Sequence, residues 1–168
     1  MQLIKHPNEW LEKQVKDFDF AKLNAEEISQ KMINCMQKFG GIGLSANQVA
    51  LNAQIFVMKP SLLETNEPFE VINPEILFVS NDITEGTEGC LSYPGLHLDV
   101  KRPATVLAEY FDKHNNQCKI TLHNLDARCF LHEYDHLQGI CFTERVSKLK
   151  LQRAIKKQRK KLKNGRSI

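Results

Sequence analysis

The segment His132-Glu133-Tyr134-Asp135-His136 restricts the fold of this chain more than any other feature. A helix turns once every 3.6 residues, so both histidines and Glu133 would share one helical face. Two imidazoles four residues apart can bind one divalent ion, and the glutamate beside them can take a proton from water on that ion. The short motif also fits a polar helix with two unrelated histidines, so its surroundings have to decide.

The surroundings favour a helix that is buried inside a domain. Asn124 can cap its start, Asp126 places a negative charge in the first turn, and Gly139 is a natural stop. The helix would have about four turns, and its apolar residues are Ala127, Phe130, Leu131, Tyr134 and Leu137. This apolar surface is enough to bury the helix, and burial would keep bulk water away from a bound ion.

Length and composition fit one ordinary domain of a cytoplasmic protein. The chain has 168 residues, enough for a complete core, and its apolar and charged fractions are those of a globular protein. We expect no membrane association, because no apolar run could cross a bilayer and the N-terminus lacks the apolar core of a signal peptide. Five cysteines at irregular spacing argue against a disulfide framework and suit a reducing compartment.

Charge divides the chain into two parts. From Arg145 to the end there are eleven Lys or Arg residues and no acid, whereas the rest of the chain carries 12 basic and 20 acidic residues. Ser147 can cap a final basic helix that ends at Asn164-Gly165, and its thin apolar stripe predicts that it projects or lies loosely on the body. We therefore expect a catalytic domain over residues 1–146 and a basic C-terminal helix within residues 147–168.

The remaining segments predict an α+β fold. Asn24-Ala25-Glu26-Glu27 has the pattern of a cap followed by acids, and apolar residues then recur at helical spacing until Gly40-Gly41. Segments rich in β-forming residues follow at 54–58, 69–72, 76–79, 105–111 and 117–123, the last two as a probable hairpin. Since there is no repeat or low-complexity linker before residue 145, we expect a single domain with antiparallel sheet.

A catalytic site of this type usually takes three protein ligands and leaves one position to water. One protease class supplies a further histidine downstream, but Phe142 stands there, and another uses a later acid, whereas no acid follows Glu144. The third ligand must therefore come from upstream. Cys129 is about 10 Å along the helix from His136, too far for two atoms on one ion. Cys90, between a glycine and a Pro-Gly turn, is a better candidate than the other cysteines, which we expect in the core.

The glycine-rich segment 40–48 is a second candidate element of a site. Residues 41–46 formally fit the dinucleotide-binding fingerprint, but that fingerprint follows a strand, whereas here a helix precedes it. Small side chains and one terminal amide better suit the rim of a substrate site, where Gln48 could donate an N–H to a developing oxyanion. A solvated glutamine after a helix cap is the alternative.

Three segments together resemble, in order and spacing, the signature motifs of the peptide deformylases. They are Gly41-Ile42-Gly43-Leu44-Ser45-Ala46-Asn47-Gln48, Glu88-Gly89-Cys90-Leu91-Ser92 and His132-Glu133-Tyr134-Asp135-His136. The resemblance extends from the first helix to about Glu144, and the basic C-terminal helix also resembles that of many bacterial members. It implies an α+β fold particular to the family, with antiparallel β-sheets around a central metal-binding helix.

The resemblance also implies a function. The enzyme would remove the formyl group from the formyl-methionine of nascent polypeptides and give formate and a free N-terminal methionine. One divalent metal ion, usually Fe(II) with Ni(II), Co(II) or Zn(II) as substitutes, would be bound by Cys90, His132 and His136. Glu133 would act as general base and acid, and Gln48 and the backbone N–H of Leu91 would hold the oxyanion.

Substrate contacts and partners follow from the same resemblance. The backbone of Ile42, Gly43 and Gly89 would pair with the peptide like an added strand, and Leu125 and Cys129 would line the methionine pocket. The basic helix would dock on the ribosome, where ribosomal RNA presents dense negative charge, without sequence-specific recognition of nucleic acid.

Three positions depart from the usual pattern of the family. Ser45 replaces a common alanine, Leu131 stands where a glutamine generally precedes the motif, and His97 lies where an arginine often contacts the peptide. None of these changes removes a ligand or Glu133. Two other functions stay open, a metallopeptidase that cleaves ordinary peptide bonds and an RNA-binding protein with a structural metal, although a structural site normally has four ligands and only three are found.

Overall fold

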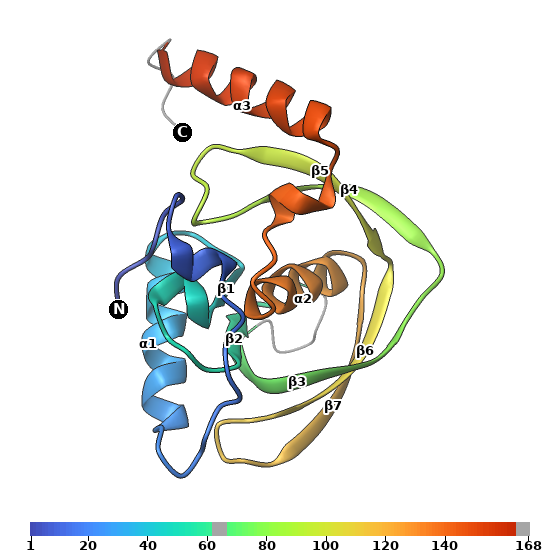
Figure 1. Ribbon diagram of the computed structural model, residues 1–168. Helices are drawn as coiled ribbons and strands as arrows, with labels where there is room; N and C mark the ends of the chain where they lie inside the picture. Colours follow the sequence, from blue (N-terminus) through green and yellow to red (C-terminus); the bar gives the residue numbers. More distant parts are fainter. Residues whose placement is uncertain (62–66, 164–168) are drawn as a thin grey trace.

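A computed structural model describes residues 1–61 and 67–163 and shows helix α2 at the centre, with strands wrapped around it (Figure 1). The helices are α1 (Ala25–Lys38), α2 (Asn124–Leu137) and α3 (Lys148–Lys163). The strands are β1 (Gly43–Ser45), β2 (Ile55–Met58), β3 (Phe69–Val79), β4 (Ile83–Gly89), β5 (His97–Pro103), β6 (Thr105–Phe111) and β7 (Gln117–His123). The predicted α+β domain with antiparallel strands around the metal-motif helix is confirmed.

The strands form two antiparallel sheets. The larger has five strands in the order β1-β2-β3-β6-β7, and the smaller is the β4–β5 hairpin. Strands β6 and β7 pair from Thr105 with His123 to Phe111 with Gln117, so the hairpin predicted at these residues is confirmed. Strand β1 lies at the edge of the larger sheet and pairs on one side with β2.

The remaining strand predictions need correction. Residues 69–72 and 76–79 belong to one strand, β3, and the register with β6 shifts between Ile72 and Glu75, where Asn73 has a φ of +48°. Asn73-Pro74 is therefore an irregularity within a strand and not a break between two. Strands β1, β4 and β5 were not predicted. Strand β4 is mostly exposed and polar, with Glu88 as its buried residue, so it lacks the alternation of apolar and polar residues that marks a strand.

Helix α2 is buried on nearly all sides, because 11 of its 14 residues are buried. The main core lies between α2, α1 and the five-stranded sheet, where the rings of Phe56 and Phe130 meet edge to face at 5.1 Å. A second apolar cluster covers the other side of α2 and consists of Leu11, Tyr93, Leu96, Leu98, Val100, Cys141 and Phe142. The polar side chains of α2 are buried with the apolar ones and must therefore be paired within the protein.

The ends of α2 differ in how closely they follow the sequence prediction. Asn124 is the first residue of the helix, with a φ of +50°, and His123 occupies the cap position without a side-chain hydrogen bond. Gly139 does end the helical segment. Its φ is +74°, and its N–H donates to the carbonyl of His136 at 2.9 Å, a common way to terminate a helix.

Helix α3 lies on the outer side of the β4–β5 hairpin (Figure 1), and none of its side chains from Lys148 to Lys161 is fully buried, which agrees with the expected loose attachment. Leu151 and Ile155 are half-buried against the second apolar cluster. Lys150 pairs with Glu85 at 2.8 Å, and Gln158 Nε2 donates to the carbonyl of Pro94 at 2.7 Å. The predicted helix end at Asn164-Gly165 lies outside the described residues. No helix in the described part of the chain has the length and apolarity needed to cross a membrane.

Candidate metal centre and active site

Cys90, His132 and His136 lie together, with their ligand atoms all within 4.8 Å of one another. Both histidines come from α2, and Cys90 directly follows β4, so the β4–β5 hairpin carries the thiol to the helix. Cys90 Sγ is 3.3 Å from His136 Nε2, and both rings are buried. One thiol and two imidazoles suit a divalent transition metal and leave a coordination position open. No second cluster of this kind occurs among the described residues.

The two histidine rings differ in charge. Burial opposes a proton on His132, but its hydrogen bonds with Cys90 and Glu88 outweigh burial and raise the pKa of the ring to about 10. Burial, followed by the charge of His132, holds the pKa of His136 well below its usual value, so that ring is neutral. The neutral His136 imidazole is in the form that binds a metal, whereas a metal ion at His132 would have to replace the proton on that ring.

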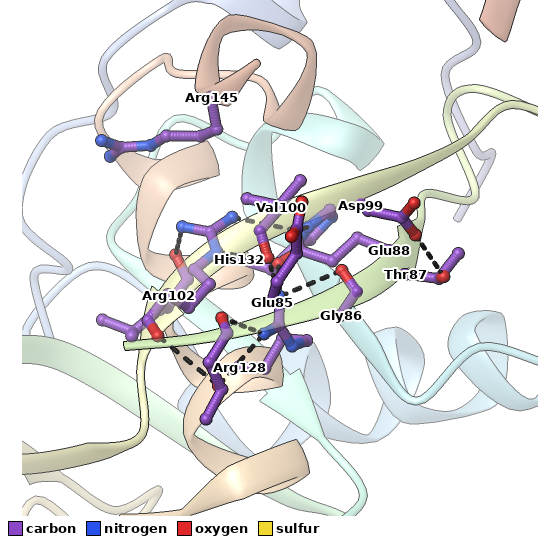
Figure 2. Close-up of polar contacts among 12 residues, drawn as sticks. Glu85, Gly86, Thr87, Glu88, Asp99, Val100, Arg102, Arg128, His132 and Arg145 are labelled. Carbon is purple, nitrogen blue, oxygen red and sulfur yellow. Dashed lines mark hydrogen bonds and ion pairs between the residues drawn. The ribbon is translucent and has the colours of Figure 1, made fainter. Parts of the chain in front are cut away.

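Glu88 holds the outer side of the His132 ring (Figure 2). Its Oε2 is 2.9 Å from His132 Nδ1, which leaves the other ring nitrogen for a metal. Arg102 donates to both carboxylate oxygens, at 2.9 and 3.0 Å, and Arg128 Nη1 donates to Oε1 at 2.9 Å. Burial would raise the pKa of Glu88, but the hydrogen bonds with His132 and Arg102 lower it to about 2. Glu88 is therefore an ionised partner that fixes the orientation of the ligand.

Arg102 extends this network to the far end of α2. Its Nη1 is 2.5 Å from Asp135 Oδ2 and 3.4 Å from the carbonyl oxygen of Leu131. Arg145, just before α3, also pairs with Asp135, with its Nε at 2.9 Å from Oδ2. The buried helix is thus joined to β5 and to the C-terminal segment by charge-assisted hydrogen bonds, which are the stronger kind.

Glu133 lies between α2 and strand β1. Ser45 Oγ is 2.7 Å from Glu133 Oε2 and 2.8 Å from the Glu133 carbonyl oxygen. A Cβ at Gly43 would come within 2.3 Å of Glu133 Oε1, so this position needs a glycine. Burial raises the pKa of Glu133, which favours its accepting a proton.

Gln48 is buried, so the alternative of a solvated glutamine is wrong. The backbone N–H of Ser45 donates to Gln48 Oε1 at 2.8 Å, which fixes the orientation of the amide. Gln48 Nε2 then points to Ser92 Oγ at 3.0 Å and to Cys90 Sγ at 3.3 Å. A hydrogen-bond donor is therefore held next to the candidate metal ligand.

Two of the candidate ligands, Cys90 and His132, line a cavity of about 560 Å³, together with Glu133, Gln48 and Leu91. Its size is typical of pockets for small ligands. It is also lined by every residue that the resemblance assigns to substrate, which are Ile42, Gly43, Gly89, Leu125 and Cys129. Ile42 and Leu125 are 50% and 49% exposed and form the rim, whereas Cys129 is buried and its thiol donates to the carbonyl of Ile42 at 3.4 Å.

A family model described as polypeptide deformylase matches residues 1–152 of the chain. The chain belongs to the peptide deformylase family. The resemblance carried by the three motifs is thereby confirmed, and the match includes both histidines, Cys90 and the first turn of α3.

Individual members of the peptide deformylase family agree with this assignment. A peptide deformylase of Bartonella quintana is 33% identical over 162 residues, which are 96% of this chain and 92% of the relative. Peptide deformylase 1B of Arabidopsis thaliana, chloroplastic/mitochondrial, is 36% identical over 152 residues, which are 88% of this chain and 54% of the relative. The chain thus spans about half the length of this plant relative.

Solved structures confirm the peptide deformylase fold. The crystal structure of a Synechococcus elongatus peptide deformylase in complex with actinonin matches with a TM-score of 0.86 and 35% sequence identity, covering 93% of this chain and 86% of the other. The Thermotoga maritima peptide deformylase matches with a TM-score of 0.80 and 31% identity, covering 87% of this chain and 97% of the other.

The three departures from the pattern of the peptide deformylase family have clear surroundings. Ser45 contacts Glu133, as described above. Leu131 is buried in the main core, and its carbonyl accepts a hydrogen bond from Arg102 at 3.4 Å. His97 pairs with Gly89 in the hairpin register and lines the cavity.

The sequence did not predict the charged residues around the candidate ligands. Arg102, Arg128 and Asp135 were not expected at the site, and Glu88 had no assigned role. Glu88 and Arg102 are 14 residues apart on opposite strands of the hairpin, and Arg102 and Asp135 are 33 apart. No local spacing joins such residues, because only the pairing of β4 with β5 and the packing of both on α2 bring them together. Their burial and their pairing could be recognised only once the β4–β5 hairpin was known.

Proposed function

We propose that the protein hydrolyses the formyl amide at the N-terminal methionine of nascent polypeptides and gives formate and a free N-terminal methionine. The observation that supports this most directly is that Cys90, His132 and His136 form one cluster, and that Cys90 and His132 line the same cavity as Glu133. Family membership supports the same reaction. A formyl group is small, and the cavity beside the ligands is bounded by the buried Glu133 and Gln48.

Different residues of the chain contribute to different steps of the proposed reaction. When bound by Cys90, His132 and His136, a divalent ion would activate a water molecule and polarise the formyl oxygen. Glu133 accepts the proton of the attacking water and returns it to the leaving nitrogen of methionine. The Gln48 amide and the backbone N–H of Leu91 donate hydrogen bonds to the formyl oxygen as it gains negative charge.

The substrate binds as an extended chain at the edge of the larger sheet. Strand β1 is an edge strand, so the backbone at Gly43 and the adjoining Ile42 can take an added strand, with Gly89 on the facing side. The methionine side chain enters the cavity between Leu125 and Cys129. This arrangement places the formyl carbon next to the ligands and Glu133.

The metal is Fe(II), and Ni(II), Co(II) or Zn(II) can take its place. A thiolate with two imidazoles accepts each of these ions, so the ligand set alone does not choose among them. Anaerobic purification followed by metal analysis tests this proposal. Iron at about one atom per chain is expected, and an anaerobically purified, active protein that contains one of the other ions and no iron would contradict Fe(II) as the ion that the protein binds in the cell.

The activity is tested with formyl-Met-Ala-Ser as substrate and a casein digest as the alternative substrate. We expect formate from the first and no cleavage of the second. Glu133→Gln should lower turnover at least about a hundredfold, the usual scale for a general acid or base, and leave the metal content nearly unchanged. Turnover within tenfold of the wild type at saturating metal would rule out Glu133 as the base, and casein cleavage would favour a peptidase.

We further propose that residues 1–146 form the catalytic domain and that residues 147–168 dock on the ribosome in the cytoplasm. This docking would not depend on the nucleic acid sequence. Residues 164–168 lie outside the described part of the chain. Helix α3 packs through Leu151 and Ile155, while many of its basic side chains are exposed. The exposed set includes Lys148, Arg153, Lys156, Lys157, Arg159, Lys160 and Lys161. A basic face of this kind suits the phosphates of ribosomal RNA.

Substituting exposed lysines tests docking without removing the packed face of α3. Lys156→Gln, Lys157→Gln and Lys160→Gln together should weaken salt-sensitive co-sedimentation with ribosomes and leave turnover of the short formyl peptide unchanged. The matched control removes as many exposed lysines from the body, with Lys16→Gln, Lys38→Gln and Lys119→Gln. Equal loss of ribosome binding in both variants, or no loss in the first, would contradict docking through α3.

A further inference from the structure

Arg145 is the surface end of the charged network around the candidate ligands, and the proposed reaction gives it no part. It is the last residue of the short 3₁₀ helix Phe142–Arg145, which lies between α2 and α3 in the chain. Its side chain is 42% exposed, whereas that of Asp135 is 8% exposed. Its Nε lies 2.9 Å from Asp135 Oδ2, and its Nη2 contacts Oδ1. The guanidinium therefore binds both oxygens of a buried carboxylate.

A continuous series of ion pairs and hydrogen bonds leads from Arg145 to the candidate ligand His132. Asp135 Oδ2 lies 2.5 Å from Arg102 Nη1. Arg102 Nε and Nη2 donate to Glu88 Oε1 and Oε2 at 2.9 and 3.0 Å. Glu88 Oε2 in turn lies 2.9 Å from His132 Nδ1. The side chains between the two ends are at most 8% exposed, so their interactions are screened much less than those of surface ion pairs.

Arg102 is shared between two carboxylates, and the sharing is unequal. Two of its nitrogens donate to Glu88 in parallel, the geometry in which a guanidinium binds a carboxylate most strongly, whereas Nη1 alone reaches Asp135. Arg145 supplies Asp135 with two further donors, one on each oxygen. Without Arg145, the buried charge of Asp135 would lose both of these donors, which is costly. Asp135 would then compete with Glu88 for the Arg102 guanidinium.

This competition affects the metal centre because Glu88 orients His132. The carboxylate holds the His132 ring at its outer nitrogen, and a partner of this kind sets how well a histidine binds a metal. Among the described residues, Nδ1 of His136 has no hydrogen-bond partner, so His132 is the histidine that the network can fix. A shift of Arg102 from Glu88 toward Asp135 would therefore loosen one of the three candidate ligands.

Attachment of the C-terminal segment to the body is a separate task, and other contacts contribute to it. Val146 packs against the second apolar cluster. Lys150 Nζ reaches Glu85 Oε1 at 2.8 Å and the carbonyl oxygen of Asp99 at 2.6 Å. These contacts lie outside the series that ends at the candidate ligand, so the two tasks can be separated by substitution.

We propose that Arg145 is a positioning residue for the metal ligand His132. It neutralises Asp135 from the solvent side and so leaves the paired N–H groups of Arg102 to Glu88. Glu88 in turn holds the His132 ring in the orientation that retains the ion. The inference rests on the proposed metal site. Arg145 does not line the cavity, so its removal should speed the loss of metal without altering substrate contacts.

The test follows Co(II) in the loaded full-length protein. Co(II) is the probe because a thiolate with two imidazoles accepts it and because its absorption spectrum reports the geometry of its ligands. In Arg145→Gln the rate at which excess EDTA removes Co(II) should rise about tenfold. This is the lower end of the roughly 10- to 100-fold loss of affinity that is typical for direct partners of metal ligands, since Arg145 acts through intervening residues. The spectrum of the bound Co(II) should also change.

Two further variants separate positioning from attachment. Arg145→Lys keeps a positive charge beside Asp135, so its release rate and spectrum should lie closer to the wild type than those of Arg145→Gln. Lys150→Gln is the matched control, because it removes a basic side chain that joins the C-terminal segment to the hairpin outside the network. It should leave both the release rate and the spectrum at wild-type values.

The outcomes distinguish this inference from the proposed function. A release rate in Arg145→Gln within about twofold of the wild type, an unchanged Co(II) spectrum, or an equal change in Lys150→Gln would overturn the role of Arg145 while the proposed function stands. A wild-type protein that binds no Co(II) would refute the proposed metal site, and this inference with it.

Discussion

Ser45 contacts both Glu133 and Gln48, the two side chains to which the proposed reaction assigns a part. Its hydroxyl is 2.7 Å from Glu133 Oε2, and its backbone N–H donates to Gln48 Oε1 at 2.8 Å. Ser45 is completely buried and does not line the cavity. Ser45→Ala therefore removes one hydrogen bond to the proposed general base and keeps the backbone bond that orients Gln48.

The size of the effect follows from this geometry. A hydrogen bond to a charged group contributes about 1.5 to 3 kcal/mol. The single hydroxyl proton is shared between Glu133 Oε2 and the Glu133 carbonyl oxygen at 2.8 Å, so the lower value applies. Since about 1.4 kcal/mol of activation free energy corresponds to a tenfold change in rate, we expect kcat to fall about tenfold. The KM should change little, because the hydroxyl does not contact the cavity.

The assay is formate release from formyl-Met-Ala-Ser at saturating metal, with metal content measured in parallel. Ser29→Ala is the matched control, because Ser29 is also buried and its hydroxyl has no partner among the described residues. It should leave kcat unchanged. A kcat for Ser45→Ala within twofold of the wild type would refute the idea that this hydroxyl positions Glu133, and a fall matched by Ser29→Ala would reduce the effect to general destabilisation.

Two further predictions concern the metal and the stability of the fold. Cys90→Ser should lose bound metal, because serine is a poorer ligand than a thiolate, whereas Cys118→Ser on β7 should keep it; metal analysis after dialysis distinguishes them. Gly139→Ala should lower the free energy of unfolding in urea by at least about 2 kcal/mol, since a positive φ alone costs about 1 to 2 kcal/mol. The added Cβ at residue 139 would also lie 2.5 Å from the carbonyl oxygen of Glu12. Gly40→Ala is the control, because Gly40 has a φ of +68° and an added Cβ there would have no atom within 4 Å, so it measures the backbone cost alone.

The parts of the fold that were predicted from the sequence depend on local patterns. The helical spacing of apolar residues gives α1 and α2, and the two segments beside the polar tip give β6 and β7 at residues 105–111 and 117–123, as observed. Strand β4 has no such pattern, because Glu88 is its one buried residue and most of Ile83–Gly89 is exposed. Its strand structure comes from pairing with β5 along its whole length, which is a long-range property.

The residues of the candidate site also differ in whether a local sequence pattern predicts them. The two histidines and Glu133 follow from helical spacing alone. Cys90 was favoured among the cysteines by its glycine-rich surroundings, and the resemblance then assigned it as a ligand. The structure brings its sulfur within 3.3 Å of His136 Nε2. Gln48 could be either a donor or a solvated side chain, because no sequence pattern reveals the bond from the Ser45 N–H that buries and orients it.

The β4–β5 hairpin and the charged network around the candidate ligands were both not predicted from the sequence, and the physical reason is the same for both. The sequence shows that α2 has enough apolar surface to be buried, but the helix also buries Arg128, Glu133 and Asp135. An isolated buried charge costs several kcal/mol, so a helix with these residues can be buried only if other segments supply partners. Arg102 of β5 pairs with Asp135, and Glu88 of β4 pairs with Arg128. The buried Arg128 and Asp135 of α2 therefore require the β4–β5 hairpin, and the same hairpin brings Cys90 to the candidate metal centre.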